Sequence, residues 1–157
     1  MVTYRKIQSK DAALLRALAQ SCPPLDVHTH YTYWVVAHFF GEYGYIAEDN
    51  GKPIGYIMTV ETKECIFVWQ IGVIDEYKGK KISSGLIENV AADAAQKGVY
   101  LEVSIADDNI PSFSTFSNFC RKNGYTMEKI GVIDLSDLAD ESFSEIESHY
   151  RITPKNE

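Results

Sequence analysis

The sequence contains few cysteines and no long apolar run. Its 157 residues include three cysteines, at positions 22, 65 and 120, which are widely spaced and form no CxxC pair. This pattern argues against a disulfide framework and a zinc site, and free thiols are typical of the cytoplasm, where we expect the protein. We expect no signal peptide, because the first fifteen residues contain no continuous apolar run. We expect no membrane span, because the longest uncharged stretch, residues 28–41, is short and mixed in polarity.

Positive charge is also scarce. Fifteen Lys and Arg against twenty-two Asp and Glu give a net charge of −7. This balance argues against nucleic acid or an anionic membrane surface as a partner, and it is compatible with a small cationic ligand. A content of 45% hydrophobic and 24% charged residues is typical of a globular chain, so we expect a single domain over residues 1–157.

Alternation and helical spacing predict an α/β (α+β) fold with a mixed central sheet flanked by helices. Asn50-Gly51 predicts a hairpin turn, and the prolines that follow Cys22 predict an extended loop. Strands are expected over residues 2–7, 43–48, 53–61, 65–74, 99–105 and 125–133, with a last edge strand over 145–152. Helices are expected from Ser9 or Asp11 onward, over 29–39, from 82 to Gly98, and from Asn109 or Ser112 to about Lys122.

A basic turn lies between the apolar strand at 65–74 and the helix from residue 82. It reads Lys78-Gly79-Lys80-Lys81. The N-terminus of a helix presents unpaired N–H groups and a partial positive charge, which together bind phosphate. Gly79 allows the backbone to approach a ligand closely. From these residues alone, an anion site and an ordinary solvated turn are about equally supported.

With Ile71-Gly72-Val73 before it, this turn resembles motif A of the GNAT superfamily of N-acetyltransferases, a [Q/R]-x-x-G-x-[G/A] loop that holds the pyrophosphate of acetyl-CoA. Lys78 then takes the Gln or Arg position, Lys81 the first Gly and Ser83 the second small position. The resemblance implies the GNAT fold, acetyl-CoA as co-substrate, no metal, and the Val73 amide as an oxyanion contact. The implied cofactor-binding residues are Ile71, Gly72, Val73, Lys78, Gly79, Lys80, Lys81, Ile82, Ser83, Ser84, Asn109 and Phe116.

Three further stretches are similar to one family within that superfamily, the L-2,4-diaminobutyrate acetyltransferases of ectoine biosynthesis. They are Cys-Pro-Pro-Leu-Asp at 22–26 with the tyrosines at 31 and 33, Phe-Val-Trp-Gln at 67–70, and the tail at 145–152. The family differs in having Asn at His28, His at Ser144, and a longer segment between Val60 and Phe67. The resemblance implies acetylation of the side-chain amine of a small diamino acid, by a cytoplasmic homodimer.

The same resemblance implies the acceptor-binding residues Asp26, Tyr31, Trp69 and Glu147. Asp26 otherwise caps the next helix, and Glu147 otherwise lies on a solvated edge; in the family reading Glu147 is a ligand or the catalytic base. The tyrosines at 31 and 33 cannot share a helix face, and we prefer Tyr31. Alternation places Trp69 on the face of Ile71 and Val73, as a wall of the acceptor pocket.

Two alternatives stay open. The chain can be a GNAT enzyme for another small amine or amino acid, because His28, Ser144 and the short segment after Val60 depart from the family's substrate-side pattern. It can also be a catalytically silent acyl-CoA-binding protein, because Lys81 departs from the loop pattern and Phe116 takes the place of the tyrosine that serves many GNAT enzymes as general acid. Phe116 cannot donate a proton. Either Tyr31, Tyr33 or Tyr150 supplies one, or the thiolate leaves unprotonated.

Overall fold

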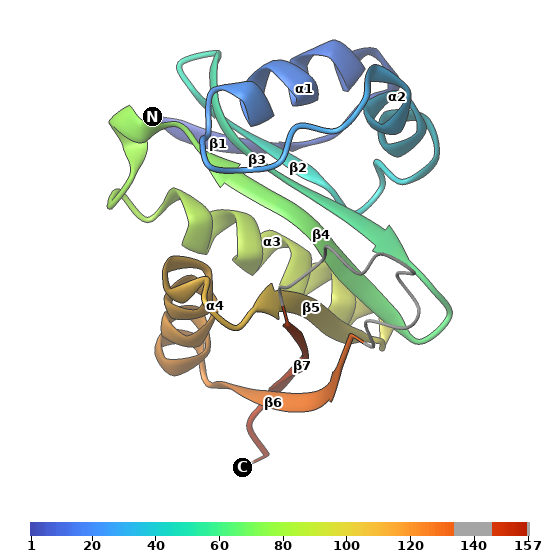
Figure 1. The fold of residues 1–157 in the computed structure, drawn as a ribbon, viewed down its shortest axis with the longest axis vertical. Coiled ribbons are helices and arrows are strands. Elements are labelled where there is room, and N and C mark those ends of the chain that lie inside the picture. The colour runs from blue at the N-terminus through green and yellow to red at the C-terminus, as the bar shows by residue number, and fades with distance from the viewer. Residues whose placement is uncertain (134–145, 157) are drawn as a thin grey trace.

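A computed structural model describes residues 1–133 and 146–156, and its strands form one sheet in the order β1-β2-β3-β4-β5-β7-β6 (Figure 1). The strands are β1 (Val2–Lys6), β2 (Tyr45–Asp49), β3 (Lys52–Glu61), β4 (Cys65–Val73), β5 (Tyr100–Ala106), β6 (Tyr125–Val132) and β7 (Glu147–Pro154). The helices are α1 (Ala12–Gln20), α2 (His30–Phe39), α3 (Ile82–Lys97) and α4 (Ile110–Asn123), with short 3-10 turns η1 (Ser9–Asp11) and η2 (Asp75–Tyr77).

The expected mixed sheet is confirmed. β4 and β5 are parallel, and the other neighbouring strands are antiparallel. Asn50 and Gly51 form the β2–β3 turn with φ angles of 49° and 84°, as an Asn-Gly hairpin turn requires. The position of β7 differs from the prediction: it pairs with both β5 and β6 and is an interior strand. Its neighbour β6 forms the edge, together with β1 at the other side.

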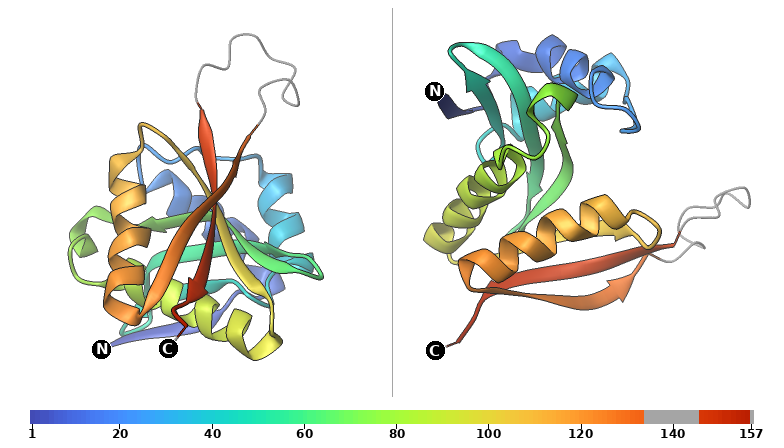
Figure 2. Two further views of the ribbon diagram at one scale, coloured as in Figure 1. Left: turned by 90° about the horizontal axis from the view of Figure 1, so that it is seen from below. Right: turned by 90° about the vertical axis from the view of Figure 1, so that its left-hand side faces the viewer.

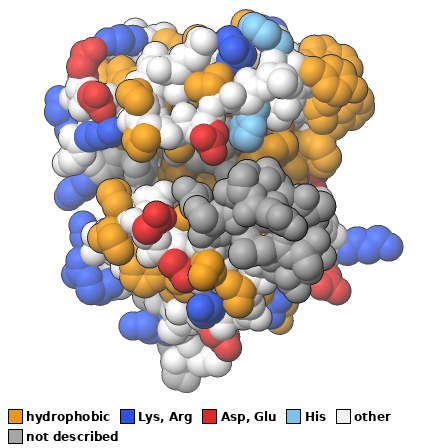
Figure 3. Space-filling model, in the orientation of Figure 1, with side chains coloured by type: hydrophobic (Ala, Val, Ile, Leu, Met, Phe, Trp, Pro, Cys, Tyr) orange, Lys and Arg blue, Asp and Glu red, His pale blue; other side chains and the backbone are white. Residues whose placement is uncertain are grey.

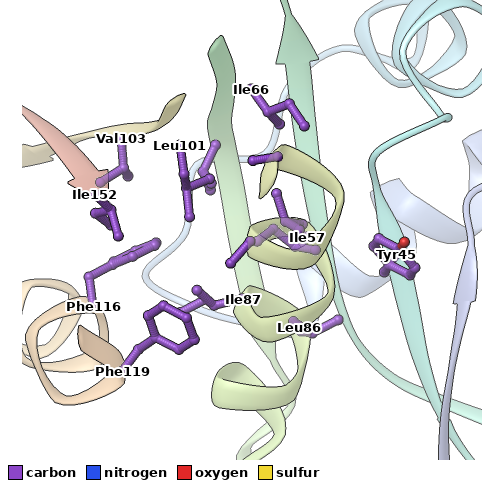
Figure 4. Close-up of a cluster of buried hydrophobic side chains, with 14 of the residues drawn as sticks. Tyr45, Ile57, Ile66, Leu86, Ile87, Leu101, Val103, Phe116, Phe119 and Ile152 are labelled. Carbon is purple, nitrogen blue, oxygen red and sulfur yellow. The ribbon is translucent and has the colours of Figure 1, made fainter. Parts of the chain in front are cut away.

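Two apolar cores lie on opposite faces of the sheet. Helices α1 and α2 cover one face of the β1–β4 part (Figure 2). On the other face of the sheet, α3 packs against β2 to β5 and α4 lies against β6. The larger core joins α3 and α4 to β4, β5 and β7 through Leu86, Phe116 and Ile152 (Figure 4). The smaller core joins α1 and α2 to β2 and β3 through Leu15, Val36 and other buried residues. No described helix is long and apolar enough to cross a membrane.

The sheet opens between β4 and β5. Within the part of the chain that the structure describes, their ladder joins only Cys65–Val68 to Tyr100–Val103, and the two strands then diverge (Figure 1). The second half of β4 therefore keeps β3 as its ladder partner on one side and has a free backbone edge on the other. This opening lies between the two layers of helices, next to the start of α3.

Candidate active site

The predicted phosphate loop lies at the start of α3. Its first α-helical bond is donated by the Gly85 N–H to the Lys81 carbonyl at 3.1 Å, so the amides of Ile82, Ser83 and Ser84 precede the intrahelical ladder. Lys81 has a φ of 66°, in the left-handed region that glycine favours. The backbone thus keeps a glycine-like conformation at the position where the motif has its first Gly, although a lysine stands there.

The surroundings of the loop fit a diphosphate. A Cβ atom placed on Gly79 would meet nothing within 4 Å, so the loop is open at that point. Lys78 Nζ lies 2.7 Å from Asp75 Oδ1, which raises the pKa of the lysine and keeps it cationic. Lys80 Nζ lies 5.1 Å from the centre of the Tyr77 ring. The loop therefore combines free helix amides with exposed cations, the combination that binds phosphate oxygens.

At the end of β4, every second backbone N–H group points into the gap between β4 and β5. The Ile74 N–H donates to the Ile54 carbonyl of β3 at 3.0 Å. Because ladder bonds alternate along an antiparallel strand, the amides of Ile71 and Val73 point away from β3, toward the gap beside β5. Gly72 has a different role: a Cβ there would lie 2.7 Å from Leu25 Cδ1, so glycine lets the loop that holds Leu25 pack onto β4.

The structure separates Asn109 and Phe116. Asn109 is exposed and caps α4, with its Oδ1 accepting a hydrogen bond from the Ser112 N–H at 3.2 Å. Phe116 is fully buried, and Figure 4 shows its ring in the larger core near Ile152. The predicted contact between Phe116 and the cofactor is thus not available in this structure, because Phe116 lies on the core face of the helix. Phe113, one turn earlier, is 41% exposed.

Phe113 borders a cavity of about 360 Å³ at the start of α4. Its ring centre lies 5.8 Å from that of Tyr150 on β7, which also lines the cavity, as do Asp107 and Ser148. Among the three tyrosines that the sequence offers as proton donors, Tyr150 is the one beside this cavity. The sequence signal for Phe113 was its position four residues after Asn109, on the same helix face.

On the other face of the sheet, Gln70 joins the stretches that carried the second resemblance. Its Oε1 accepts hydrogen bonds from the Tyr33 hydroxyl at 3.1 Å and the Tyr56 hydroxyl at 2.6 Å. Its Nε2 donates to the Asp26 carbonyl at 2.7 Å. Gln70 is buried at 7% exposure, so its bonds with the two hydroxyl groups are shielded from water. One side chain of β4 thereby fixes both α2 and the loop before it.

The loop at residues 22–25 is a tight turn rather than the expected extended segment. The Leu25 N–H donates to the Cys22 carbonyl at 2.9 Å, and the bond between Pro23 and Pro24 is cis. The buried Cys22 and half-buried Leu25 pack against Gly72. Asp26 follows this turn and is exposed. The helix cap that was the alternative role of Asp26 belongs to Thr29, whose side chain accepts from the Thr32 N–H at 3.2 Å.

Trp69 lies on the opposite face from the one that alternation predicts. A β-bulge interrupts the β3–β4 register between Met58 and Thr59, which are paired with Gln70 and Val68. After the bulge, Ile71 and Val73 pack with the core on the α3 side of the sheet. The Trp69 ring lies on the opposite side, where α1 and α2 lie, 5.4 Å from the ring of His28. The extra residue of a bulge shifts the alternation of side chains between the two faces of the sheet, and this explains why the predicted face of Trp69 was wrong. Trp69 is 41% exposed beside the loop that carries Asp26.

The structure favours Tyr33 over Tyr31 at this site. Tyr33 is fully buried, bonded to Gln70, and its hydroxyl accepts from the His28 N–H at 3.3 Å. Tyr31 is 72% exposed on the outer side of α2 and stacks on Trp34. Figure 3 shows apolar side chains gathered over the end of the molecule where α2 lies. The preference for Tyr31 as a pocket wall is therefore not supported in the single chain.

Glu147 begins β7 on the side of the sheet opposite α4. It is half-buried, and its Oε1 accepts from the Ser104 hydroxyl at 3.2 Å. Glu145, which the sequence places beside it in the tail motif, lies outside the described residues, as does Ser144. Along β7, the side chains of Ser148, Tyr150 and Ile152 point to the α4 side, so Glu147, His149 and Arg151 point to the other.

The cysteines are not activated. All three are buried and free, and burial raises the pKa of Cys22, that of Cys65, and that of Cys120, the last to about 11. Each therefore stays a neutral thiol, which is a poor nucleophile. Among the described residues, no three His, Cys, Asp or Glu side chains gather as a metal site would require. Whether the protein works without a metal stays a prediction.

Sequence reasoning assigned no role to Gln70 or His28, which the structure places at the centre of the site. A glutamine within the apolar run of β4 was the available signal, because a polar residue buried in a strand needs partners. His28 was interpreted as a surface or packing residue, yet its ring lies between Trp69 and Tyr33, 5.4 Å and 6.0 Å from their rings. Its carbonyl accepts from Arg16 Nε at 3.3 Å.

Comparison with known sequences finds relatives over almost the whole chain. The family model for acetyltransferases of the GNAT family matches residues 12–124. An L-2,4-diaminobutyric acid acetyltransferase of Nocardia farcinica is 29% identical over 154 residues, which cover 96% of this chain and 79% of that protein.

Solved structures share the fold. The diaminobutyrate acetyltransferase of Paenibacillus lautus, in complex with its substrate L-2,4-diaminobutyric acid and coenzyme A, matches with a TM-score of 0.84 at 21% identity, covering 100% of this chain and 98% of that one. The ribosomal-protein-S18-alanine N-acetyltransferase of Escherichia coli matches with a TM-score of 0.77 at 13% identity, covering 100% and 97%. Enzymes with different acceptors thus share this fold. By the family model, which spans most of its length, the chain belongs to the GNAT family of acetyltransferases.

Proposed function

We propose that this enzyme transfers the acetyl group of acetyl-CoA to the side-chain amine of L-2,4-diaminobutyrate, by direct attack of the amine on the thioester. The observation that carries the proposal is the bond from Gln70 Nε2 to the Asp26 carbonyl. It joins two of the stretches by which the sequence resembles diaminobutyrate acetyltransferases. The relative from Nocardia farcinica, which has that activity, aligns with nearly the whole chain.

On the cofactor side, the start of α3 would hold the pyrophosphate of acetyl-CoA. Its free amides and the lysines at 78, 80 and 81 supply hydrogen bonds and positive charge. The thioester carbonyl would then meet the Val73 amide at the opening beside β4, where an N–H donor stabilises the negative charge that develops on the oxygen during attack. Acetyl-CoA supplies the activated acyl group.

On the acceptor side, the Asp26 carboxylate and the Trp69 ring would hold the cationic diamino acid, with Glu147 as a second carboxylate. Gln70 and Gly72 fix the Asp26 loop against β4, so Asp26 is presented by a packed element rather than a mobile one. Tyr150, beside the cavity at the start of α4, is the tyrosine that we propose as proton donor to the departing thiolate. The neutral, buried cysteines disfavour an acetyl-cysteine intermediate.

The test is release of free CoA thiol by the purified protein, with diaminobutyrate compared with ornithine, lysine and putrescine. We expect the highest kcat/KM for diaminobutyrate. Faster turnover of lysine or putrescine would overturn the substrate assignment, and absence of thiol release with every amine would overturn the catalytic one.

Two variants test the map of the site. Lys78→Ala is expected to raise the KM for acetyl-CoA, and Asp26→Asn the KM for the amine, each by roughly 10- to 100-fold, since a charge-assisted hydrogen bond contributes roughly 1.5–3 kcal/mol. Lys63→Ala, an exposed lysine in the β3–β4 turn, is the matched control and should change neither. Exchange of the two effects would contradict the map.

The homodimer and the cytoplasmic location stay predictions. The exposed aromatic side chains of α2, Tyr31 at 72%, Trp34 at 42% and Phe39 at 65%, are where we expect a second copy to bind. Light scattering of the wild type and of Trp34→Ser would measure this. The unpaired cysteines are compatible with a reducing compartment.

A further inference from the structure

A buried carboxylate lies on the side of the sheet opposite α4, and the proposed mechanism does not use it. Glu102 of β5 is 6% exposed. Its Oε2 accepts from Arg151 Nε at 3.1 Å and Nη2 at 3.0 Å, and its Oε1 lies 2.8 Å from His149 Nε2. Two of these bonds join Glu102 to the Arg151 guanidinium, and the third fixes the orientation of the His149 ring.

His149 lies on the acceptor side of the opening. It occupies the same face of β7 as Glu147, and its register partner on β5 is Ser104, which bonds to Glu147. Its ring centre lies 6.0 Å from that of Phe67, which is on β4 two residues before Trp69. The side chain is 34% exposed, so it is accessible while its partner carboxylate is buried.

With Nε2 hydrogen-bonded to a carboxylate, the neutral ring carries its proton on Nε2 and leaves Nδ1 as the basic atom. An ammonium group with a pKa of about 10 must lose a proton before it can attack. Transfer to an ordinary carboxylate is uphill by about six orders of magnitude in the equilibrium constant, and transfer to an ordinary imidazole by between three and four. An imidazole is the better acceptor, so Glu147 is left with the binding of the cation.

We infer that His149, positioned by Glu102, is the group that takes the proton from the acceptor amine, directly or through one water. This inference rests on the proposed function. The N–H bond of the ammonium breaks and its proton moves to Nδ1. The freed electron pair forms the bond to the thioester carbon, and the C–S bond breaks. Tyr150 gives its hydroxyl proton to the thiolate and recovers one from the second proton on nitrogen, and His149 returns its proton to solvent.

Other titratable groups lie around His149. Glu102 and Tyr100 are on β5, Cys65 is on β4, Glu128 is on β6, and Glu147 and Arg151 are on β7. Burial raises the pKa of the Cys65 thiol, and the bond to Glu102 raises the pKa of Arg151. Neither changes charge in the range from about pH 5 to 8 in which histidines titrate. A rate change in that range that His149→Gln abolishes is therefore assigned to His149.

The experiment measures kcat/KM for diaminobutyrate against pH in the wild type, His149→Gln and Glu102→Gln. We expect kcat/KM of the wild type to rise with pH between about pH 5 and 8, as the histidine loses its proton. This rise is called the limb of the profile below. Glutamine at position 149 can still donate a hydrogen bond to Glu102, but it cannot accept a proton. His149→Gln should therefore lower kcat about 100-fold, as loss of a general base does, and abolish the limb. His38→Gln, on the outer side of α2, is the matched control and should keep both rate and limb.

A wild-type profile without this limb overturns the inference, and so does a His149→Gln variant that keeps the rate and the limb. Should His149→Gln fail to fold, Glu102→Gln decides: without the carboxylate that orients the His149 ring, kcat should fall by about tenfold or more while the KM for acetyl-CoA is kept. A Glu102→Gln variant that keeps the wild-type kcat overturns the inference. If the wild type does not acetylate diaminobutyrate, the proposed function fails separately, and the same profiles are measured on the amine that it does acetylate.

Discussion

Replacing Gln70 by leucine should destabilise the protein and loosen the acceptor site. The change removes the acceptor for two buried hydroxyl groups, those of Tyr33 and Tyr56, and the donor to the Asp26 carbonyl. The Asp26 loop is exposed, so water can replace the lost donor there. Tyr56 is fully buried, and burial raises the pKa of its hydroxyl, which therefore stays a neutral donor without a partner.

Each buried hydroxyl left unpaired costs about 1–3 kcal/mol. Tyr33 keeps one partner, since its oxygen still accepts from the His28 N–H. We therefore expect Gln70→Leu to lower the free energy of unfolding by about 3 kcal/mol, which for a chain of this length lowers Tm by about 9 °C. The KM for the amine should rise more than the KM for acetyl-CoA, because the bond to the Asp26 loop is lost.

Urea unfolding of a double-mutant cycle separates this cause from simple loss of packing. Tyr56→Phe alone should cost about 1 kcal/mol. In the Gln70→Leu, Tyr56→Phe double variant no Tyr56 hydroxyl remains unpaired, so it should be more stable than the sum of the single changes by about 1–2 kcal/mol. If the two changes add to within about 0.5 kcal/mol, the hydrogen-bond argument is refuted.

Two further predictions concern the left-handed backbone at Lys81 and the stability that Asp11 contributes at low pH. Lys81→Gly should raise the free energy of unfolding by about 1 kcal/mol, because glycine adopts the left-handed conformation at φ 66° without strain. Lys81→Val should lower the free energy of unfolding, and urea unfolding measures both. Equal effects of the two changes would contradict the argument. Burial alone would raise the pKa of Asp11, but hydrogen bonds from Arg5 and the Gln8 amide bring it below its usual value. Asp11 therefore contributes stability that is present above about pH 4 and is lost as the pH falls through the lowered pKa. The stability difference between wild type and Asp11→Asn should shrink below about pH 4, and a difference that is independent of pH would refute the assignment.

The order of the elements and the main motifs were predictable from local pattern. Asn50-Gly51, the apolar run of β4 and the basic turn before α3 each carry a local signal, and the structure places strands, turn and helix where those signals indicate. The left-handed backbone at Lys81 is a further example, since the alignment to the loop motif identified that position as one for glycine.

What the sequence could not predict depends on contacts between distant segments. The bulge opposite Met58 and Thr59 arises from pairing between strands, and it moved Trp69 to the other face. The choice between Tyr31 and Tyr33 depended on Gln70, a partner thirty-seven positions away from Tyr33. The location of β7 depended on whether it pairs with one strand or two, which a pattern of alternating residues does not reveal.

The interior position of β7 has a consequence for the order in which the protein is made. As a ribosome synthesises the chain, β1 to β4 with α1 to α3 emerge first and can pair locally, because β2, β3 and β4 are sequential neighbours. β5 and β6 emerge next, yet the strand that belongs between them comes after both. Until β7 arrives, β5 is held to the sheet only by its short ladder with β4. The face that carries Glu102 is therefore completed last, and a nascent chain that lacks β7 exposes unpaired strand edges, which are prone to aggregation.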